Sequence, residues 1–160
     1  MKKWLIGFCV VIGLFFLLAI WVLSSLLYNE YEVLEANWGI KLPQATEVKD
    51  LLTTENSFHG DGEWFTLLEY SKPIDLIESN FVKLSLEEIA NANNKIANFQ
   101  RRTLEIRQND KTVVDVFKTY DVKAEVNDYY YYEERNNGFD TIVLLYKTQT
   151  QQLYKYEWHQ

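Results

Sequence analysis

His59, Asp61 and Glu63 form the polar cluster whose residue types and spacing could do chemistry. An imidazole and two carboxylates within five residues can bind a metal ion or share acid–base catalysis. Gly60 and Gly62 alternate with them, as a tight turn requires, and aspartate favours turns. A loop histidine beside two acids, without a second set of ligands, is a weak metal motif. The pattern therefore favours a structural turn, and a metal-assisted hydrolase centred on this loop is an alternative.

The sequence lacks the usual components of other active sites. It holds two histidines and one cysteine, with no GxSxG elbow, phosphate-binding loop or HExxH motif. His159 stands near the end of the chain, where an exposed side chain is expected. Cys9 follows the bulky Phe8 inside an apolar run, which argues against a lipoprotein cysteine. We expect no enzyme activity, no cofactor and no bound metal.

Aromatic residues make up 16% of the chain and include four consecutive tyrosines, Tyr129 to Tyr132. Alternation along a strand sends two of these rings to each face of a sheet. Trp38, Trp64, Tyr130 and Tyr132 are candidates for an exposed aromatic surface that stacks on glycan rings or anchors a protein. Packing of rings between neighbouring strands explains the same pattern more simply.

Charge is divided sharply along the chain. Lys2 and Lys3 are the only charged residues before Glu30, so the remainder holds 14 basic and 23 acidic residues and a net charge of −9. Such a domain is repelled by nucleic-acid phosphates and by anionic lipid headgroups. We expect no nucleic-acid partner.

Residues 4–27 form an uncharged apolar run. At about 1.5 Å per helical residue, this run matches a bilayer core of roughly 30 Å. It is longer than the apolar region of a secretory signal and offers only a poor cleavage site near Ser25, so an uncleaved anchor is favoured over a cleaved signal. Lys2 and Lys3 before the run, and acidic residues after it, place the N-terminus in the cytoplasm. We expect a single-pass protein of the cell membrane that contacts lipid through residues 4–27.

Three regions follow from these patterns. Residues 1–28 are the transmembrane anchor, 29–37 a juxtamembrane stalk or frayed helix, and 38–160 an extracytoplasmic, extracellular domain. In that domain Ser85 and Glu88 form a capping box that begins a helix. The helix is expected over 86–105, with a buried stripe at Ile89, Ala92, Ile96, Phe99, Thr103 and Ile106, and with Asn91, Asn94, Lys95, Asn98 and Arg102 toward solvent.

The other elements complete an α+β fold. Residues 111–126 fit both a strand and a helical face and stay undecided. An antiparallel sheet of about five strands, packed against one main helix, is expected. The strands are predicted at 46–54, 63–70, 128–134, 140–147 and 151–158, and a short helix at 73–78.

Several blocks of the sequence resemble an uncharacterised family of small secreted or membrane-anchored proteins of Gram-positive bacteria. The blocks are residues 39–43, the loop at 58–63, the tyrosines at 129–132 with Arg135, and the segments 139–146 and 153–157. Family members typically carry a histidine after that arginine and an Asp-Thr-Asp-Thr turn near the end. Here Asn136 follows Arg135 and the turn reads Lys147-Thr148-Gln149-Thr150, so no role of that histidine carries over. The resemblance implies architecture and no reaction.

An anchor joined to a domain without catalytic parts predicts a non-enzymatic module at the cell surface. It would bind a protein partner or monitor the envelope. One alternative is a cell-wall carbohydrate-binding domain that uses Trp38, Trp64 or the tyrosines. The other is the hydrolase centred on His59, Asp61 and Glu63.

Overall fold

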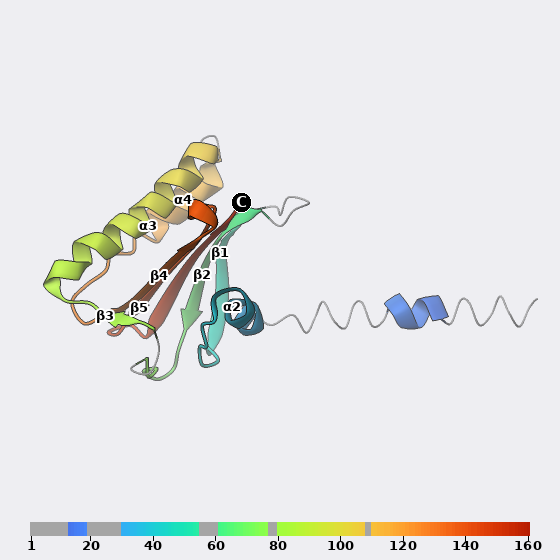
Figure 1. Cartoon of the computed structure of the whole chain (residues 1–160), viewed down its shortest axis with the longest axis horizontal. Coiled ribbons are helices and arrows are strands. Elements are labelled where there is room, and N and C mark those ends of the chain that lie inside the picture. Colours follow the sequence, from blue (N-terminus) through green and yellow to red (C-terminus); the bar gives the residue numbers. More distant parts are fainter. Residues whose placement is uncertain (1–12, 19–29, 55–60, 77–79, 108–109) are drawn as a thin grey trace, which may run out of the picture. The chain divides into compact units, whose positions relative to one another are not determined.

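The computed structural model describes residues 13–18, 30–54, 61–76, 80–107 and 110–160 (Figure 1). The chain divides into two compact units, Met1–Leu42 and Pro43–Gln160. In the first unit residues 13–18 are helical, and α2 spans Glu30–Trp38. Leu34 and Trp38, one turn apart on α2, are both buried. A helix thus occupies most of the segment expected to be a stalk or a frayed helix.

The predicted membrane anchor lies mostly beyond the described residues. Residues 4–12 and 19–27 fall outside them, and only 13–18 are seen. Within the described parts of the chain, no helix has the length and apolar character needed to cross a bilayer. The anchor therefore stays a prediction from the sequence.

The second unit is an α+β fold built on a six-stranded sheet in which every neighbouring pair is antiparallel. Figure 1 shows α3 and α4 on the same side of this sheet. The strand order is β1-β2-β6-β5-β4-β3, so the N-terminal hairpin joins the C-terminal meander through β2 and β6. The elements are β1 Glu47–Thr53, β2 Gly62–Glu69, β3 Val82–Lys83, α3 Leu86–Ile106, α4 Lys111–Thr119, β4 Tyr129–Arg135, the short helix η1 Asn136–Gly138, β5 Asp140–Lys147 and β6 Gln152–His159.

The five predicted strands are confirmed, but the sheet has a sixth. β3 pairs Val82 with Tyr130 and Lys83 with Tyr129. Two residues are too few for a period-two pattern, which is why the sequence did not indicate this strand.

The short helix predicted at 73–78 is wrong over its described part. Residues 73–76 have no regular structure, and 77–78 lie outside the described residues. The amide of Ile74 donates to the hydroxyl of Tyr146 at 3.2 Å, and Leu76 is buried. Tertiary contacts of this irregular segment replace the helical hydrogen bonds that it would otherwise make.

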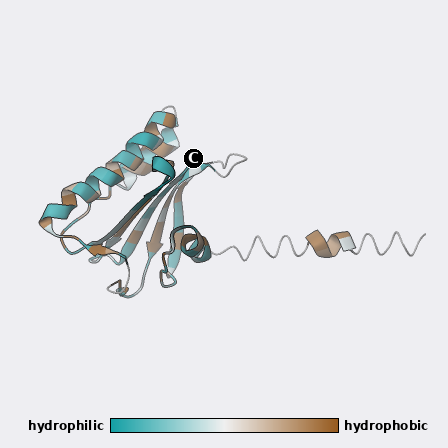
Figure 2. Cartoon of the chain, viewed as in Figure 1, coloured by the Kyte–Doolittle hydropathy of each residue, from teal (hydrophilic) through white to brown (hydrophobic). Residues whose placement is uncertain are grey.

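α3 begins at the predicted capping box. The amide of Ser85 donates to the Glu88 carboxylate at 2.9 Å, which satisfies a backbone donor at the start of the helix. The central positions of the predicted stripe, Ala92, Ile96, Phe99 and Thr103, are buried, whereas Ile106 at the last turn is exposed. Figure 2 shows apolar and polar residues alternating along α3, as an amphipathic helix requires.

The undecided stretch at 111–126 begins as helix α4. The Asp110 carboxylate accepts hydrogen bonds from the amides of Thr112 at 2.8 Å and Val113 at 3.4 Å. This N-cap satisfies free amides of the first turn, and Val113 and Phe117, one turn apart, are both buried. The helical reading therefore holds as far as Thr119, and the chain then runs without regular structure to β4.

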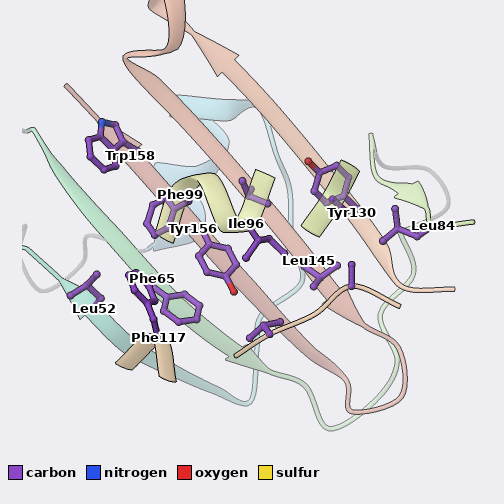
Figure 3. Close-up of a cluster of buried hydrophobic side chains, with 14 of the residues drawn as sticks. Leu52, Phe65, Leu84, Ile96, Phe99, Phe117, Tyr130, Leu145, Tyr156 and Trp158 are labelled. Atoms are coloured by element: carbon purple, nitrogen blue, oxygen red, sulfur yellow. The ribbon is translucent and has the colours of Figure 1, made fainter. Parts of the chain in front are cut away.

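The core lies between the sheet and the two helices and is rich in rings (Figure 3). Phe65 of β2 stacks on Tyr156 of β6, with centroids 4.4 Å apart, and Phe99 of α3 meets Tyr156 at 5.3 Å. Offset and edge-on ring contacts of this kind add to the burial of apolar area. Much of the aromatic content of the chain is therefore core.

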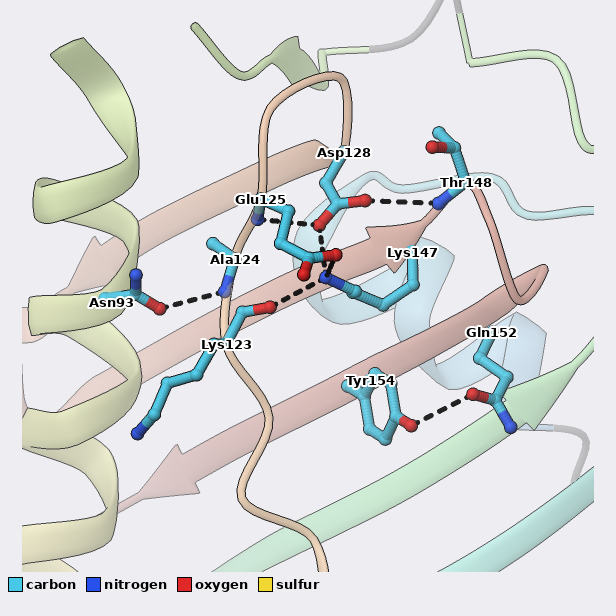
Figure 4. Close-up of polar contacts among 9 residues, drawn as sticks. All are labelled: Asn93, Lys123, Ala124, Glu125, Asp128, Lys147, Thr148, Gln152 and Tyr154. Atoms are coloured by element: carbon cyan, nitrogen blue, oxygen red, sulfur yellow. Dashed lines mark hydrogen bonds and ion pairs between the residues drawn. The ribbon is translucent and has the colours of Figure 1, made fainter. Parts of the chain in front are cut away.

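A polar clasp ties the segment before β4 to its surroundings (Figure 4). The ammonium group of Lys147 lies 2.7 Å from the buried Asp128 carboxylate and 2.6 Å from that of Glu125. Asp128 also accepts from the amides of Glu125 at 2.8 Å and Thr148 at 3.2 Å. These contacts satisfy a carboxylate that is only 1% exposed.

Candidate functional site

The loop cluster predicted from the sequence is seen only in part. His59 lies outside the described residues, and Asp61 is half-buried just before β2. Glu63 is buried: its carboxylate lies 3.2 Å from the Arg107 guanidinium, and its amide donates to the Thr54 hydroxyl at 2.8 Å. Among the described residues, no three histidines, cysteines or acids are grouped so that they could hold a metal ion. Glu63 has structural partners that fix the start of β2.

The four candidate aromatics do not gather on one surface. Trp38 and Tyr130 are 4% and 8% exposed, so neither presents a ring to solvent. Tyr130 belongs to the core cluster because alternation in β4 turns it toward the helices. Tyr132 and Trp64 are half-buried. The strand register places Tyr132 on the helix side and Trp64 on the opposite face.

A second polar group lies on the sheet face that points away from α3. His159 of β6 bonds through Nδ1 to Asp140 at 3.0 Å and through Nε2 to Glu157 at 2.9 Å. Lys155 pairs with the same Glu157 at 2.8 Å. The hydrogen bond to the Glu157 carboxylate, and after it the bond to Asp140, raises the pKa of His159.

This group consists of mutually satisfied charges. The prediction of an exposed His159 is wrong, since its side chain is only 25% exposed and both ring nitrogens bond carboxylates. The spacing of Lys155, Glu157 and His159 at every second residue could have placed them on one face of a strand. Because both ring nitrogens of His159 bond carboxylates, neither nitrogen is available to a substrate.

A cavity of about 370 Å³ lies between α3 and the sheet, at the hairpin that joins β4 to β5. We name it the α3 cavity. It is lined by Lys95, Asn98, Phe99, Arg101 and Arg102 of α3, Tyr132 and Glu134 of β4, Asn137 and Gly138 of η1, Thr141 and Val143 of β5, and Trp158 of β6. All of these residues belong to the second unit.

Aromatic rings hold two of the cations in this cavity. The Lys95 ammonium lies 3.9 Å from the centre of the Tyr132 ring, and the Arg102 guanidinium 4.4 Å from that of Trp158. Arg102 also donates to the carbonyl of Gly138 at 3.2 Å. The prediction that Lys95 and Arg102 simply face solvent is therefore wrong: both are half-buried, because their long side chains lie over the rings of the sheet.

The opposite wall is fixed by the tip of the hairpin. Asn137 and Gly138 have φ of 57° and 88°, the left-handed region that asparagine and glycine tolerate best. A Cβ at Gly138 would come within 3.1 Å of the Glu134 carboxylate. Burial, followed by the hydrogen bond to Glu134, raises the pKa of Tyr132 to about 12. The Tyr132 hydroxyl therefore stays protonated and donates to Glu134.

The chemistry of this lining suits binding. It offers cations, amide groups, the hydroxyls of Tyr132 and Thr141 and the carboxylate of Glu134, and it contains no histidine, cysteine or serine. Sequence reasoning missed the site because Lys95, Asn98 and Arg102, at helical spacing, look like an ordinary solvent face. Their aromatic partners come from strands far along the chain.

No family model, curated protein sequence or solved structure matches this chain. The resemblance to the Gram-positive family therefore stays a prediction from the quoted blocks.

Proposed function

We propose that this chain is a non-enzymatic binding module, tethered to the cell membrane by residues 4–27, whose α+β domain takes a small polar ligand of the envelope in the α3 cavity. The cavity falls at the lower end of the roughly 300–1,000 Å³ typical of small-molecule sites. Its volume of about 370 Å³ suits a compact ligand better than a protein surface.

The observation that carries the proposal is the state of the two cations. Neither Lys95 nor Arg102 forms an ion pair with a carboxylate among the described residues; each lies over a ring instead. A cation over an aromatic ring is held in position while its charge stays available to a third group. This arrangement supports a site that is organised before its ligand arrives.

Of the earlier alternatives, carbohydrate binding has specific support in the structure. Asn98 of α3 and Asn137 of η1 line the cavity, and Thr141 of β5 lines it too, so amide and hydroxyl groups are part of the site. Such groups donate and accept hydrogen bonds, as a sugar with several hydroxyls requires. The relevant rings are Tyr132 and Trp158, which hold the cations, in place of Trp38 and Trp64.

A cavity-blocking substitution tests this function. Asn98→Trp places a large ring at the cavity, and Asn91→Trp is its matched control, because Asn91 is also exposed on α3 but does not line the cavity. The probe is a mixture of soluble fragments from enzymatically digested peptidoglycan, passed over the immobilised full-length chain in detergent.

The wild type and Asn91→Trp are expected to retain fragments that Asn98→Trp does not. Mass spectrometry of the eluate identifies what is retained. Equal retention by both tryptophan variants, or no retention by the wild type, would overturn the proposed function.

A further inference from the structure

The α3 cavity is a basic site on an acidic domain. Residues 29–160 carry a net charge of −9, yet the cavity lining holds three cations, Lys95, Arg101 and Arg102, against one acid, Glu134. Arg101 is compensated by an ion pair with Glu105 at 2.8 Å on the exposed side of α3. The charge directed at the cavity therefore comes mainly from Lys95 and Arg102.

The geometry of these two cations suits a planar anion. Arg102 uses Nη1 to donate to the Gly138 carbonyl, which fixes the plane of the guanidinium. Guanidinium groups bind carboxylates through two parallel hydrogen bonds, and a lysine adds a point charge. Lys95 and Arg102 lie two turns apart on the same face of α3, with Asn98 between them, so an anion at the centre of this face is within reach of both.

The remaining polar groups indicate what else the ligand carries. Asn98 and Asn137 can each donate and accept, and Thr141 offers a hydroxyl, so the walls match a compound with several hydroxyl groups. Phe99, Val143 and Trp158 also line the cavity, but they are themselves buried, so the groups that a ligand meets are mainly polar.

We propose that the ligand of the α3 cavity is an acidic sugar, a pyranose that bears a carboxylate, bound with its carboxylate between Lys95 and Arg102. This rests on the proposed function and names the chemical class of the ligand. Glu134 is the one acid of the lining, so it opposes the anion and sets the orientation of the ring.

Calorimetric titration of the full-length chain in detergent tests the ligand class, with glucuronate, glucose and glucose 6-phosphate as probes. Glucuronate should bind at least roughly tenfold more tightly than glucose, because a charge-assisted hydrogen bond contributes that much. Its affinity should fall as salt is raised. The proposal would be overturned if glucose bound as tightly as glucuronate, or if glucose 6-phosphate bound more tightly than glucuronate.

Three variants locate the carboxylate. Lys95→Met and Arg102→Gln should each weaken glucuronate binding roughly tenfold, and should weaken it more than they weaken glucose binding. Glu134→Gln keeps an acceptor for the Tyr132 hydroxyl but removes the opposing charge, so it should tighten glucuronate binding several-fold. Lys118→Met, which removes an exposed lysine of α4 outside the cavity, is the charge-matched control.

The outcomes separate this inference from the proposed function. Suppose that the wild type retains peptidoglycan fragments, that Asn98→Trp does not, and that glucose and glucuronate bind with equal affinity. The proposed binding module would then be supported, and the acidic-sugar ligand would be contradicted. Equal loss of glucuronate binding in Lys118→Met would show a general charge effect and would also overturn the inference. Thermal unfolding of each variant shows whether it is folded. If Lys95→Met is not folded, Lys95→Gln takes its place, because a polar side chain suits this half-buried position.

Discussion

Lys155 and Glu157 form a buried ion pair on β6, with 2.8 Å between the ammonium nitrogen and a carboxylate oxygen. Their residues are 6% and 5% exposed, and their spacing of two puts both on the same face of the strand. Taking two charges out of water costs free energy, which offsets much of the attraction between them. Loss of one partner is costly, because it leaves the other charge buried without that compensation.

Removing one partner should therefore be much worse than removing both. Lys155→Met removes the ammonium partner of the buried Glu157 carboxylate, which keeps its bond with His159, and should lower the free energy of unfolding by roughly 1–3 kcal/mol. The double variant Lys155→Met/Glu157→Leu should recover much of that loss. Urea unfolding followed by circular dichroism measures both effects, with Lys118→Met as the exposed control. Equal losses in the single and double variants would mean that the two charges are not coupled.

His159 makes stability depend on pH near neutrality. The neighbouring carboxylates raise its folded-state pKa above the ordinary value of 6.5. Its contribution to stability is therefore fully present below pH 6.5 and is lost as pH rises through the raised pKa. In His159→Gln the free energy of unfolding should differ most from the wild type at acidic pH and least above the raised pKa.

Denaturant unfolding of both proteins across this pH range checks that prediction. Because the other titratable groups are shared, the difference between wild type and His159→Gln isolates the histidine. A difference that does not change with pH would show that protonation of His159 is not linked to folding.

The elements that could be predicted from the sequence are those determined by neighbouring residues. Asp140 to Lys147 contains a continuous apolar run, residues 142–146, and is bounded by turn residues, and the strand occupies those same residues. Ser85 and Glu88 mark the start of α3 for a similar reason, since a capping box involves only neighbouring residues. Where a few adjacent residues decide the structure, the sequence is enough.

The remainder depends on contacts between distant segments. Val113 and Phe117 are residue types compatible with a strand. They lie in a helix because Asp110 caps its first turn and both side chains pack in the core. The cavity is a stronger case. Lys95 looks like a solvent-facing lysine until Tyr132 is placed beneath it by the pairing of β4 with β5. The site is a product of sheet register, which single residues of α3 do not encode.

The polar clasp of Lys147, Asp128 and Glu125 should determine how stably the segment before β4 is held. Asp128→Ala removes the acceptor of the Glu125 and Thr148 amides and leaves both without it. It should lower the free energy of unfolding by roughly 2–3 kcal/mol and increase hydrogen exchange at these two amides. Asp121→Ala is a matched control, because Asp121 is an exposed acid whose partner, Lys123, is also exposed.

Hydrogen exchange monitored by mass spectrometry resolves this effect. Faster exchange confined to peptides that cover Glu125 and Thr148 is the expected pattern. Unchanged protection there in Asp128→Ala would show that the clasp is incidental to the fold.

The predicted topology can be tested without knowledge of the ligand. Lys2 and Lys3 precede the apolar run of residues 4–27, and the acidic domain follows it, so the tendency of positive charge to stay in the cytoplasm predicts that residues 38–160 lie outside the cell. A protease added to intact spheroplasts should therefore digest that domain and leave a short N-terminal fragment with the membrane. Lys2→Glu/Lys3→Glu should reduce this digestion, because it removes the positive charge that orients the segment. Full protection of the wild-type domain would contradict the topology, and an intact domain free in the medium would instead indicate cleavage near Ser25.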